Sequence, residues 1–328
     1  MTRSDDSGAD ELDTYRLARR AVLKATGGAA ALSLGAGTAA AANHNNGHSG
    51  NENGNGPGTG QGDSNPNYID PVFGQASAEP KPESFRPPVR PDHEVDMLFT
   101  VENLLFAAAA ELDEDQRTAV NSAAADGTVT SQEAGDLDET ITIETPNGPE
   151  EVPLSAVAGA LTETLGFNFE PAGLVVEPGD IVVFDAVSPD HLVASYHERH
   201  GRQNRVPGDP GSGTGLISSP LIPVGGYWLY QFEEPGVYDL NCTVHELFGM
   251  VIRVVVTDDP NDVPELDVDE GSGRPPEDVN EIELVFGGLD PNLPSALGAL
   301  ETDALSPGNI VDEGEVSWEA VVEEHRTS

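Results

Sequence analysis

The sequence is poor in the residues that most often carry covalent or nucleic-acid chemistry. Its 328 residues include one cysteine, Cys242, so no disulfide can form within the chain. Lysine occurs only at Lys24 and Lys81, and 15 lysines and arginines face 58 acidic residues, which gives a formal net charge of −43. A chain this acidic is repelled by the phosphate backbone, and this argues against nucleic acid as a partner.

Aromatic residues and long apolar runs are also scarce. Aromatic side chains make up 5% of the sequence, whereas there are 36 glycines and 26 prolines, so we expect one core and much linker. The acidic excess is typical of proteins adapted to high salt, in which counter-ions screen the repulsion between carboxylates. The apolar run after Arg20 is interrupted by Lys24 and several glycines, so no transmembrane span is predicted.

The N-terminal segment has the pattern of an export signal. Arg19 and Arg20 precede a weakly apolar stretch, and small residues near position 40 offer a cleavage site, so residues 1–42 resemble a twin-arginine signal peptide. Residues 43–91 are rich in Gly, Asn and Pro and are predicted to be a disordered linker. The protein is therefore expected outside the cytoplasm, soluble or at the cell surface.

Short β-branched segments dominate the middle of the chain. They are separated by turn signals such as the Glu-Pro-Gly-Asp stretch at 177–180, and no helical pattern intervenes. This predicts an antiparallel sandwich or barrel. The expected strands are 93–99, 173–176, 181–186, one starting near 191, 226–232, 237–242 and 250–256.

Two other regions differ from this pattern. Residues 103–166 read as helix, hairpin and helix, which predicts an insertion between the first two strands. Residues 259–328 form an acidic extension, in which we expect a short strand at 282–286 and a helix at 294–300.

The cysteine lies in the stretch CTVHELFGM, residues 242–250. A structural zinc site normally gathers several thiolates, and a thiolate nucleophile would need an oxyanion-loop signal that the chain lacks. The third possibility is a mononuclear copper site, which takes a thiolate, two imidazoles and a weak axial thioether. Cys242, His245 and Met250 would supply three of these ligands from one loop.

The fourth ligand must come from another strand. His191 follows the Pro189-Asp190 turn at the start of a predicted strand, where such a ligand is needed. His197 and His200 compete for this role, but six residues of extended strand would displace His197 by about 20 Å. No observation on the residues alone removes this alternative, because a bend would bring His197 back.

Taken together, residues 169–257 resemble the cupredoxins, the blue-copper family of plastocyanin, pseudoazurin and halocyanin. The resemblance rests on VEPGDIVVF leading to His191 and on the C-x2-H-x4-M spacing of Cys242, His245 and Met250. It implies an all-β, eight-stranded Greek-key sandwich over residues 92–258. It also implies one type 1 copper ion, with His191, Cys242 and His245 in its plane and Met250 axial. Leu192 departs from the pattern, because many relatives have an asparagine there that ties the ligand loops together.

The family implies one-electron transfer between redox partner proteins, by a monomer that is not an enzyme. Leu247 and Phe248 would then either form part of an apolar docking patch or simply shield the metal. Arg199, Arg202 and Arg205 would either pair with nearby carboxylates or meet an acidic partner. A copper carrier or scavenger with the same ligands, but without an electron partner, is the alternative function.

Overall fold

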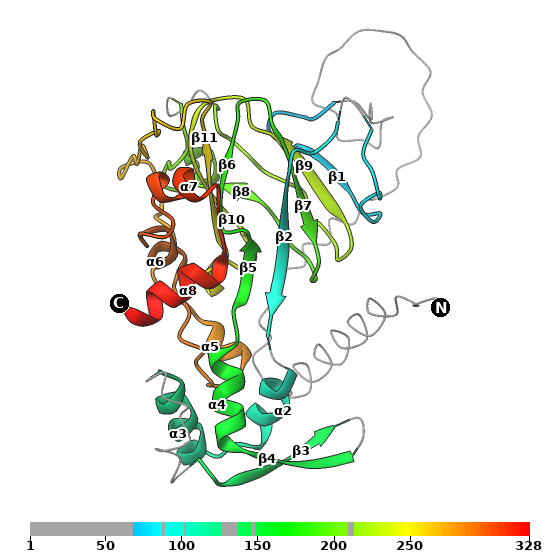
Figure 1. Cartoon of the computed structure of the whole chain (residues 1–328), viewed down its shortest axis with the longest axis vertical. Helices are drawn as coiled ribbons and strands as arrows, with labels where there is room; N and C mark the ends of the chain where they lie inside the picture. Colours follow the sequence, from blue (N-terminus) through cyan, green and yellow to red (C-terminus); the bar gives the residue numbers. More distant parts are fainter. Residues whose placement is uncertain (1–67, 87–88, 102, 126–136, 146–147, 209–212) are drawn as a thin grey trace, which may run out of the picture.

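The computed structural model describes residues 68–86, 89–101, 103–125, 137–145, 148–208 and 213–328. The predicted signal peptide and residues 43–67 of the predicted linker lie outside these ranges. Within the described residues, the strands form two five-stranded sheets and one two-stranded hairpin. The two large sheets lie together in the upper part of Figure 1, and helices α2 to α4 lie with the hairpin at the lower end.

The first sheet contains one parallel pair. Strand β2 runs parallel to β7 and antiparallel to β5, and β9 runs antiparallel to both β7 and β1. The linker predicted over 43–91 is wrong at 75–77, because these residues form β1. In spatial order the strands are β1 (Gln75–Ser77), β9 (Tyr227–Gln231), β7 (Ile181–Ala186), β2 (His93–Thr100) and β5 (Gly166–Glu170).

The second sheet is also mixed, since β6 runs parallel to β11. The prediction of purely antiparallel pairing is therefore wrong in both large sheets. Parallel strands need a long crossover, and here the crossovers pass through other strands, which a strand pattern read along the sequence cannot reveal. In spatial order the strands are β12 (Glu315–Val316), β6 (Gly173–Val176), β11 (Val251–Val256), β10 (Gly236–Asn241) and β8 (Ala194–Ser195).

The two sheets pack face to face around one apolar core. Alternate residues of each strand point inward, so Phe184 and Trp228 of the first sheet meet Leu240 and Ile252 of the second. Cys242 and Met250 belong to the same buried cluster. The candidate ligands are therefore supplied from the edge of this core.

The region between β2 and β5 contains two helices, a hairpin and a third helix, whereas the sequence predicted one helix before the hairpin. Its buried side chains, such as Leu105 and Leu161, belong to a second apolar cluster. The elements are α2 (Asn103–Glu111), α3 (Glu114–Ala125), β3 (Thr140–Thr145), β4 (Gly148–Pro153) and α4 (Leu154–Thr162).

The C-terminal region adds helices to the outer side of the second sheet (Figure 1). The strand predicted at 282–286 is wrong, because these residues turn into helix α5, whereas the helix predicted near 294–300 is confirmed as α6. Trp318 at the start of α8 donates its indole N–H to the Leu165 carbonyl at 2.8 Å. The elements are α5 (Ile282–Val285), α6 (Ala296–Leu300), α7 (Pro307–Glu313) and α8 (Trp318–Thr327).

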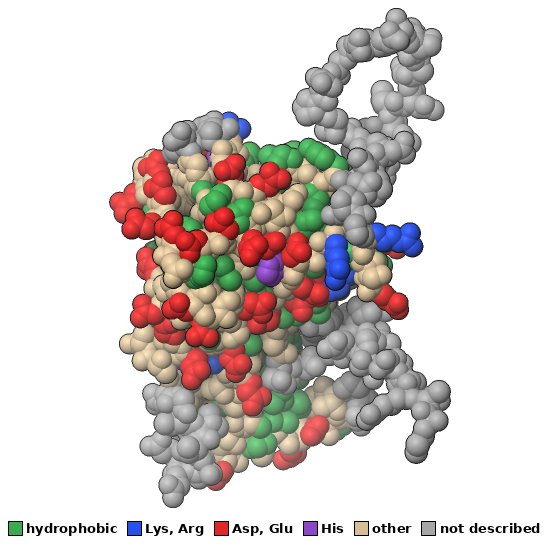
Figure 2. Space-filling view, turned by 45° about the horizontal axis from the view of Figure 1, so that its top comes forward, with side chains coloured by type: hydrophobic (Ala, Val, Ile, Leu, Met, Phe, Trp, Pro, Cys, Tyr) green, Lys and Arg blue, Asp and Glu red, His purple; other side chains and the backbone are tan. Residues whose placement is uncertain are grey.

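Acidic side chains are spread over the face shown in Figure 2, and lysine and arginine are few there. Among the described residues, no helix combines the length and the apolar character that a bilayer crossing requires.

Candidate metal centre

The segment between β10 and β11 folds into a compact loop. Cys242 directly follows β10, and Met250 directly precedes β11. The Cys242 N–H donates to the Met250 carbonyl at 3.1 Å, and the Met250 N–H donates to the His245 carbonyl at 3.4 Å. The short 3-10 helix η2 (Glu246–Phe248) fills the loop. The backbone thus brings Met250 beside Cys242, although eight positions separate them in the sequence.

His191 comes from a different part of the chain. Asp190 has φ +60°, a left-handed conformation that Asp tolerates better than most residues, and it turns the chain into His191. The backbone of His191 then pairs with Ile222 in both directions, at 3.0 and 2.8 Å. This double hydrogen bond fixes His191, which is fully buried, at the edge of the core.

The two imidazoles converge on the sulfur. The Cys242 Sγ lies 3.3 Å from Nδ1 of His245 and 3.8 Å from Nδ1 of His191. The three potential ligand atoms all lie within 4.8 Å of one another. Metal–sulfur bonds of ~2.3 Å and metal–nitrogen bonds of ~2.0 Å place ligand atoms at most ~4.3 Å apart, so small shifts would let these side chains share one ion. A thiolate with two imidazoles also fits copper in its chemistry.

Neighbouring side chains orient these groups. Nε2 of His191 lies 2.8 Å from Ser188 Oγ, so an Nε2–H that donates to Ser188 leaves the Nδ1 lone pair facing the sulfur. The ring of Phe167 stacks on His245, with centroids 3.9 Å apart and planes 14° from parallel. The Leu192 N–H donates to the Cys242 sulfur at 3.4 Å. Leu192 therefore contacts the sulfur through its backbone, whereas its side chain has no hydrogen-bonding group.

Burial governs the protonation of all three groups. It raises the pKa of the Cys242 thiol to about 12, an effect that backbone N–H groups partly offset. It lowers the pKa of His191 to about 3, and together with His191 it lowers the pKa of His245 to about 3. Both imidazoles are therefore neutral at pH 7, the form that binds a cation, whereas the thiol stays protonated until a bound cation displaces its proton.

The other predicted histidines serve a different purpose. His197 caps the short helix η1 (Glu198–His200), and its Nδ1 accepts a hydrogen bond from the Arg199 N–H at 3.0 Å. His200 Nδ1 lies 3.0 Å from the Ser195 carbonyl oxygen. Within the described residues, the cluster of His and Cys ligand atoms contains only His191, Cys242 and His245.

Arg202 and Arg205 pair with buried carboxylates. Arg202 forms a bidentate ion pair with Glu246, and Arg205 donates to Asp239 at 2.7 Å. Phe248 packs against the second apolar cluster, whereas Leu247 is 42% exposed. Phe248 is thus partly covered by that cluster, and Leu247 remains on the surface.

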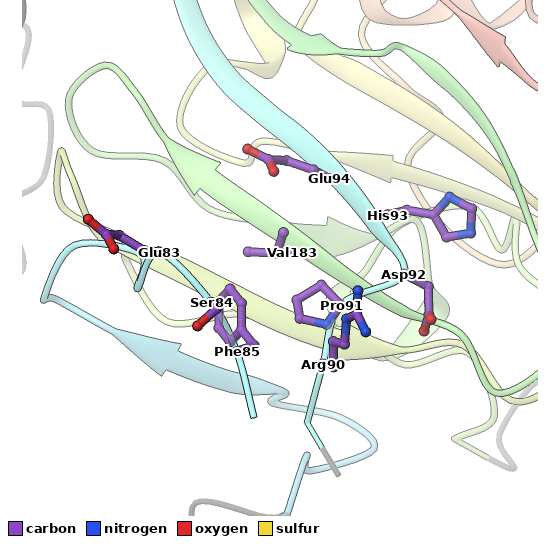
Figure 3. Close-up of a pocket in the computed structure, with 9 residues that line it drawn as sticks. All are labelled: Glu83, Ser84, Phe85, Arg90, Pro91, Asp92, His93, Glu94 and Val183. Atoms are coloured by element: carbon purple, nitrogen blue, oxygen red, sulfur yellow. The ribbon is translucent and has the colours of Figure 1, made fainter. Parts of the chain in front are cut away.

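Two other features lie outside this centre. The acidic side chains of Glu94, Asp96 and Asp185 come together, but Lys81 forms ion pairs with Glu94 and Asp185. A cavity of about 560 Å³ is lined by residues 83–85 and 90–94, with Val183 of β7 among them (Figure 3). None of the candidate ligands lines it.

Comparison with known proteins gives only local likenesses. No family model and no curated protein matches the chain. A stretch covering 29% of this chain is similar to 66% of pseudoazurin from Methylobacterium extorquens AM1, with 28% identity and a TM-score of 0.23. Pseudoazurin from Hyphomicrobium denitrificans gives 24% identity over 30% of this chain and 68% of that chain, with a TM-score of 0.23. An amicyanin variant in its reduced Cu(I) form gives 24% identity over 27% and 73%, with a TM-score of 0.22. Most of the chain lies outside each of these likenesses.

Proposed function

We propose that this protein is an electron carrier that binds one copper ion in a type 1 site. His191, Cys242 and His245 would form the ligand plane, and Met250 would be the axial ligand. When bound, copper supplies a Cu(II)/Cu(I) couple, through which one electron from a reduced partner protein reaches an oxidised one without transfer of atoms. The convergence of two neutral imidazole nitrogens on one buried sulfur carries this proposal.

The surrounding residues would keep this centre rigid and dry. Ser188 holds the His191 ring, and the ring of Phe167 covers one face of His245. The Leu192 N–H points at the sulfur and favours the thiolate over the thiol. A site in which the ligands barely move between oxidation states suits electron transfer and requires no catalytic group.

The domain assignment belongs to the same proposal. Residues 92–258 would form a cupredoxin-like Greek-key sandwich, residues 103–166 an insertion in it, and residues 259–328 an extension packed on its outer face. Export by the twin-arginine pathway through residues 1–42 would place a monomer outside the cytoplasm, where it would meet its redox partners.

The visible spectrum of the copper-loaded, oxidised protein tests the ligand set. The parent protein should show an intense sulfur-to-copper charge-transfer band, and Cys242→Ser should abolish it, because serine offers no thiolate. His197→Gln is the matched control and should retain the band. A band that persists in Cys242→Ser, or that disappears in His197→Gln, would refute the assignment.

The alternative function, a copper carrier, is distinguished by kinetics. An electron carrier should be reduced and reoxidised rapidly by small redox proteins. A copper carrier should instead bind Cu(I) far more tightly than Cu(II) and exchange electrons slowly.

A further inference from the structure

A buried charge cluster lies beside the candidate ligands. Glu246 directly follows His245 in the loop, and its carboxylate is 4% exposed. It receives a bidentate ion pair from Arg202, whose Nη1 lies 2.5 Å from Oε2, and a hydrogen bond from the Tyr196 hydroxyl at 2.8 Å. The Glu277 N–H also donates to it, at 3.2 Å.

Two partners of Glu246 come from the segment that carries the other histidine. Tyr196 and Arg202 follow His191 along the chain, after the short strand β8. The Arg202 guanidinium also lies over the Tyr196 ring, with its carbon 4.9 Å from the ring centroid. The cluster therefore joins the segment bearing His191 to the loop bearing His245.

Burial makes this connection stiff. A buried carboxylate without its partners would cost several kcal/mol, so the loop cannot leave Arg202 and Tyr196 without a large penalty. The carbonyl of Glu246 also accepts the Gly249 N–H at 2.9 Å, and that of His245 accepts the Phe248 N–H at 2.9 Å. Fixing the Glu246 side chain thus fixes the turn that aims His245.

The pair also contributes charge close to the centre. The negative charge of Glu246 favours the more positive oxidation state of a nearby metal, and the positive charge of Arg202 opposes it. Because both are buried, solvent and salt screen them little. Arg274 lies 3.8 Å from Glu246 but is 56% exposed, so it compensates weakly for a lost Arg202.

We propose that Glu246 is a positioning residue for the metal centre. Held by Arg202 and Tyr196, it locks the His245 loop onto the segment bearing His191, and its balance with Arg202 sets the reduction potential. This inference rests on the proposed copper function. It predicts that two substitutions at one ion pair move the potential in opposite directions.

The experiment measures the reduction potential of copper-loaded variants. Glu246→Gln should raise the potential, because Arg202 is left unbalanced, and Arg202→Met should lower it, because Glu246 is left unbalanced. The double variant should fall between them. Arg90→Met is the control for loss of one cation away from the centre. Arg90 is exposed and lies near the start of β7, whereas the segment that bears His191 follows Ala186, at the other end of that strand.

A second readout needs no copper. In the metal-free protein, amide hydrogen exchange at Phe248 and Gly249 should accelerate at least about tenfold in Glu246→Gln, since a hydrogen bond to a charged group is worth ~1.5–3 kcal/mol. Tyr196→Phe removes one hydrogen bond without changing charge and is the mildest variant. It should accelerate the same exchange and move the potential less than the charge variants do.

The outcomes separate this inference from the function on which it rests. If the two charge variants shift the potential in the same direction, or by no more than Arg90→Met does, the electrostatic role is wrong. Unchanged exchange in both Tyr196→Phe and Glu246→Gln would overturn the positioning role. A parent protein without a sulfur-to-copper band would instead refute the copper function, while the exchange result would still test the connection between the two segments.

Discussion

Residues that bind no metal orient the side chains of the candidate centre. Ser188 selects which nitrogen of His191 faces the sulfur, and the Leu192 N–H donates to that sulfur. Phe167 reaches His245 from β5, so a residue of the first sheet orients a proposed ligand in the loop after β10 of the second sheet. The orientation of each imidazole therefore depends on one identifiable neighbour.

Replacing Phe167 tests this at the level of one side chain. In metal-free Phe167→Leu, the His245 ring protons should move in the NMR spectrum, because a stacked aromatic ring shifts the resonances of the ring it covers. The free energy of unfolding in urea should fall by ~1–2 kcal/mol through lost stacking and packing.

Phe169→Leu, on the same strand, is the matched control for Phe167→Leu. Phe169 meets Phe184 edge to face, with centroids 6.3 Å apart, and should cost similar stability while leaving the His245 resonances in place. Equal NMR shifts in both variants would mean that Phe167 does not orient His245.

The sequence predicts the candidate ligands better than it predicts the residues that hold those ligands in place. Cys242, His245 and Met250 fall within nine residues, so their spacing alone suggests a site. Ser188 stands three positions before His191 and could have been noticed as a possible partner. No local pattern joins Arg202 to Glu246, 44 positions apart, because that pairing depends on how β8 lies against β10.

Strand β11 explains why the C-terminal elements matter to the centre. All six of its residues are buried, since Ile252 and Val254 face the core between the sheets and Val251 and Val255 face the C-terminal helices. A strand buried on both faces reads as a nearly continuous apolar run, interrupted here by Arg253, which is why its sequence predicts a strand but not its helical cover. Likewise, the apolar run at 282–286 is too short to distinguish strand from helix, and the prediction of a strand there is wrong.

Gly249 lies where the ligand loop meets this C-terminal cover. Its φ is +84°, and an added Cβ would overlap the Pro294 carbonyl oxygen, which already accepts a hydrogen bond from Asn280 at 2.7 Å. Gly249→Ala should therefore combine backbone strain of ~1 kcal/mol with an overpacking cost of ~1–3 kcal/mol. Urea unfolding of the metal-free protein measures the total.

Gly201→Ala isolates the strain component. Gly201 also ends a 3-10 helix in the left-handed conformation, with φ +72°, but among the described residues an added Cβ there meets no atom within 4 Å. It should cost only ~1 kcal/mol. Equal losses in the two variants would show that the Pro294 segment yields and does not confine the ligand loop.

At the scale of the whole molecule, buried and exposed charges have opposite consequences. Asp239 is fully buried and is held by Arg205 at 2.7 Å and Arg253 at 2.6 Å, which connects β10, β11 and the segment after His191. The exposed carboxylates, spread over the face in Figure 2, face few cations and repel one another. Dissolved salt weakens that repulsion but reaches the buried pairs little.

The stability of the protein should therefore rise with ionic strength. The Debye length falls from ~30 Å at 0.01 M salt to ~3 Å at 1 M, so most of the repulsion within a chain of net charge −43 is removed over this range. With a gain of ~3 kcal/mol, Tm of the metal-free protein should increase on the order of 10 °C. Sodium chloride and choline chloride should act alike at equal ionic strength, because screening depends on charge and not on the identity of the cation. A rise in sodium chloride alone would point to specific cation binding, and an unchanged Tm in both salts would mean that carboxylate repulsion does not limit stability.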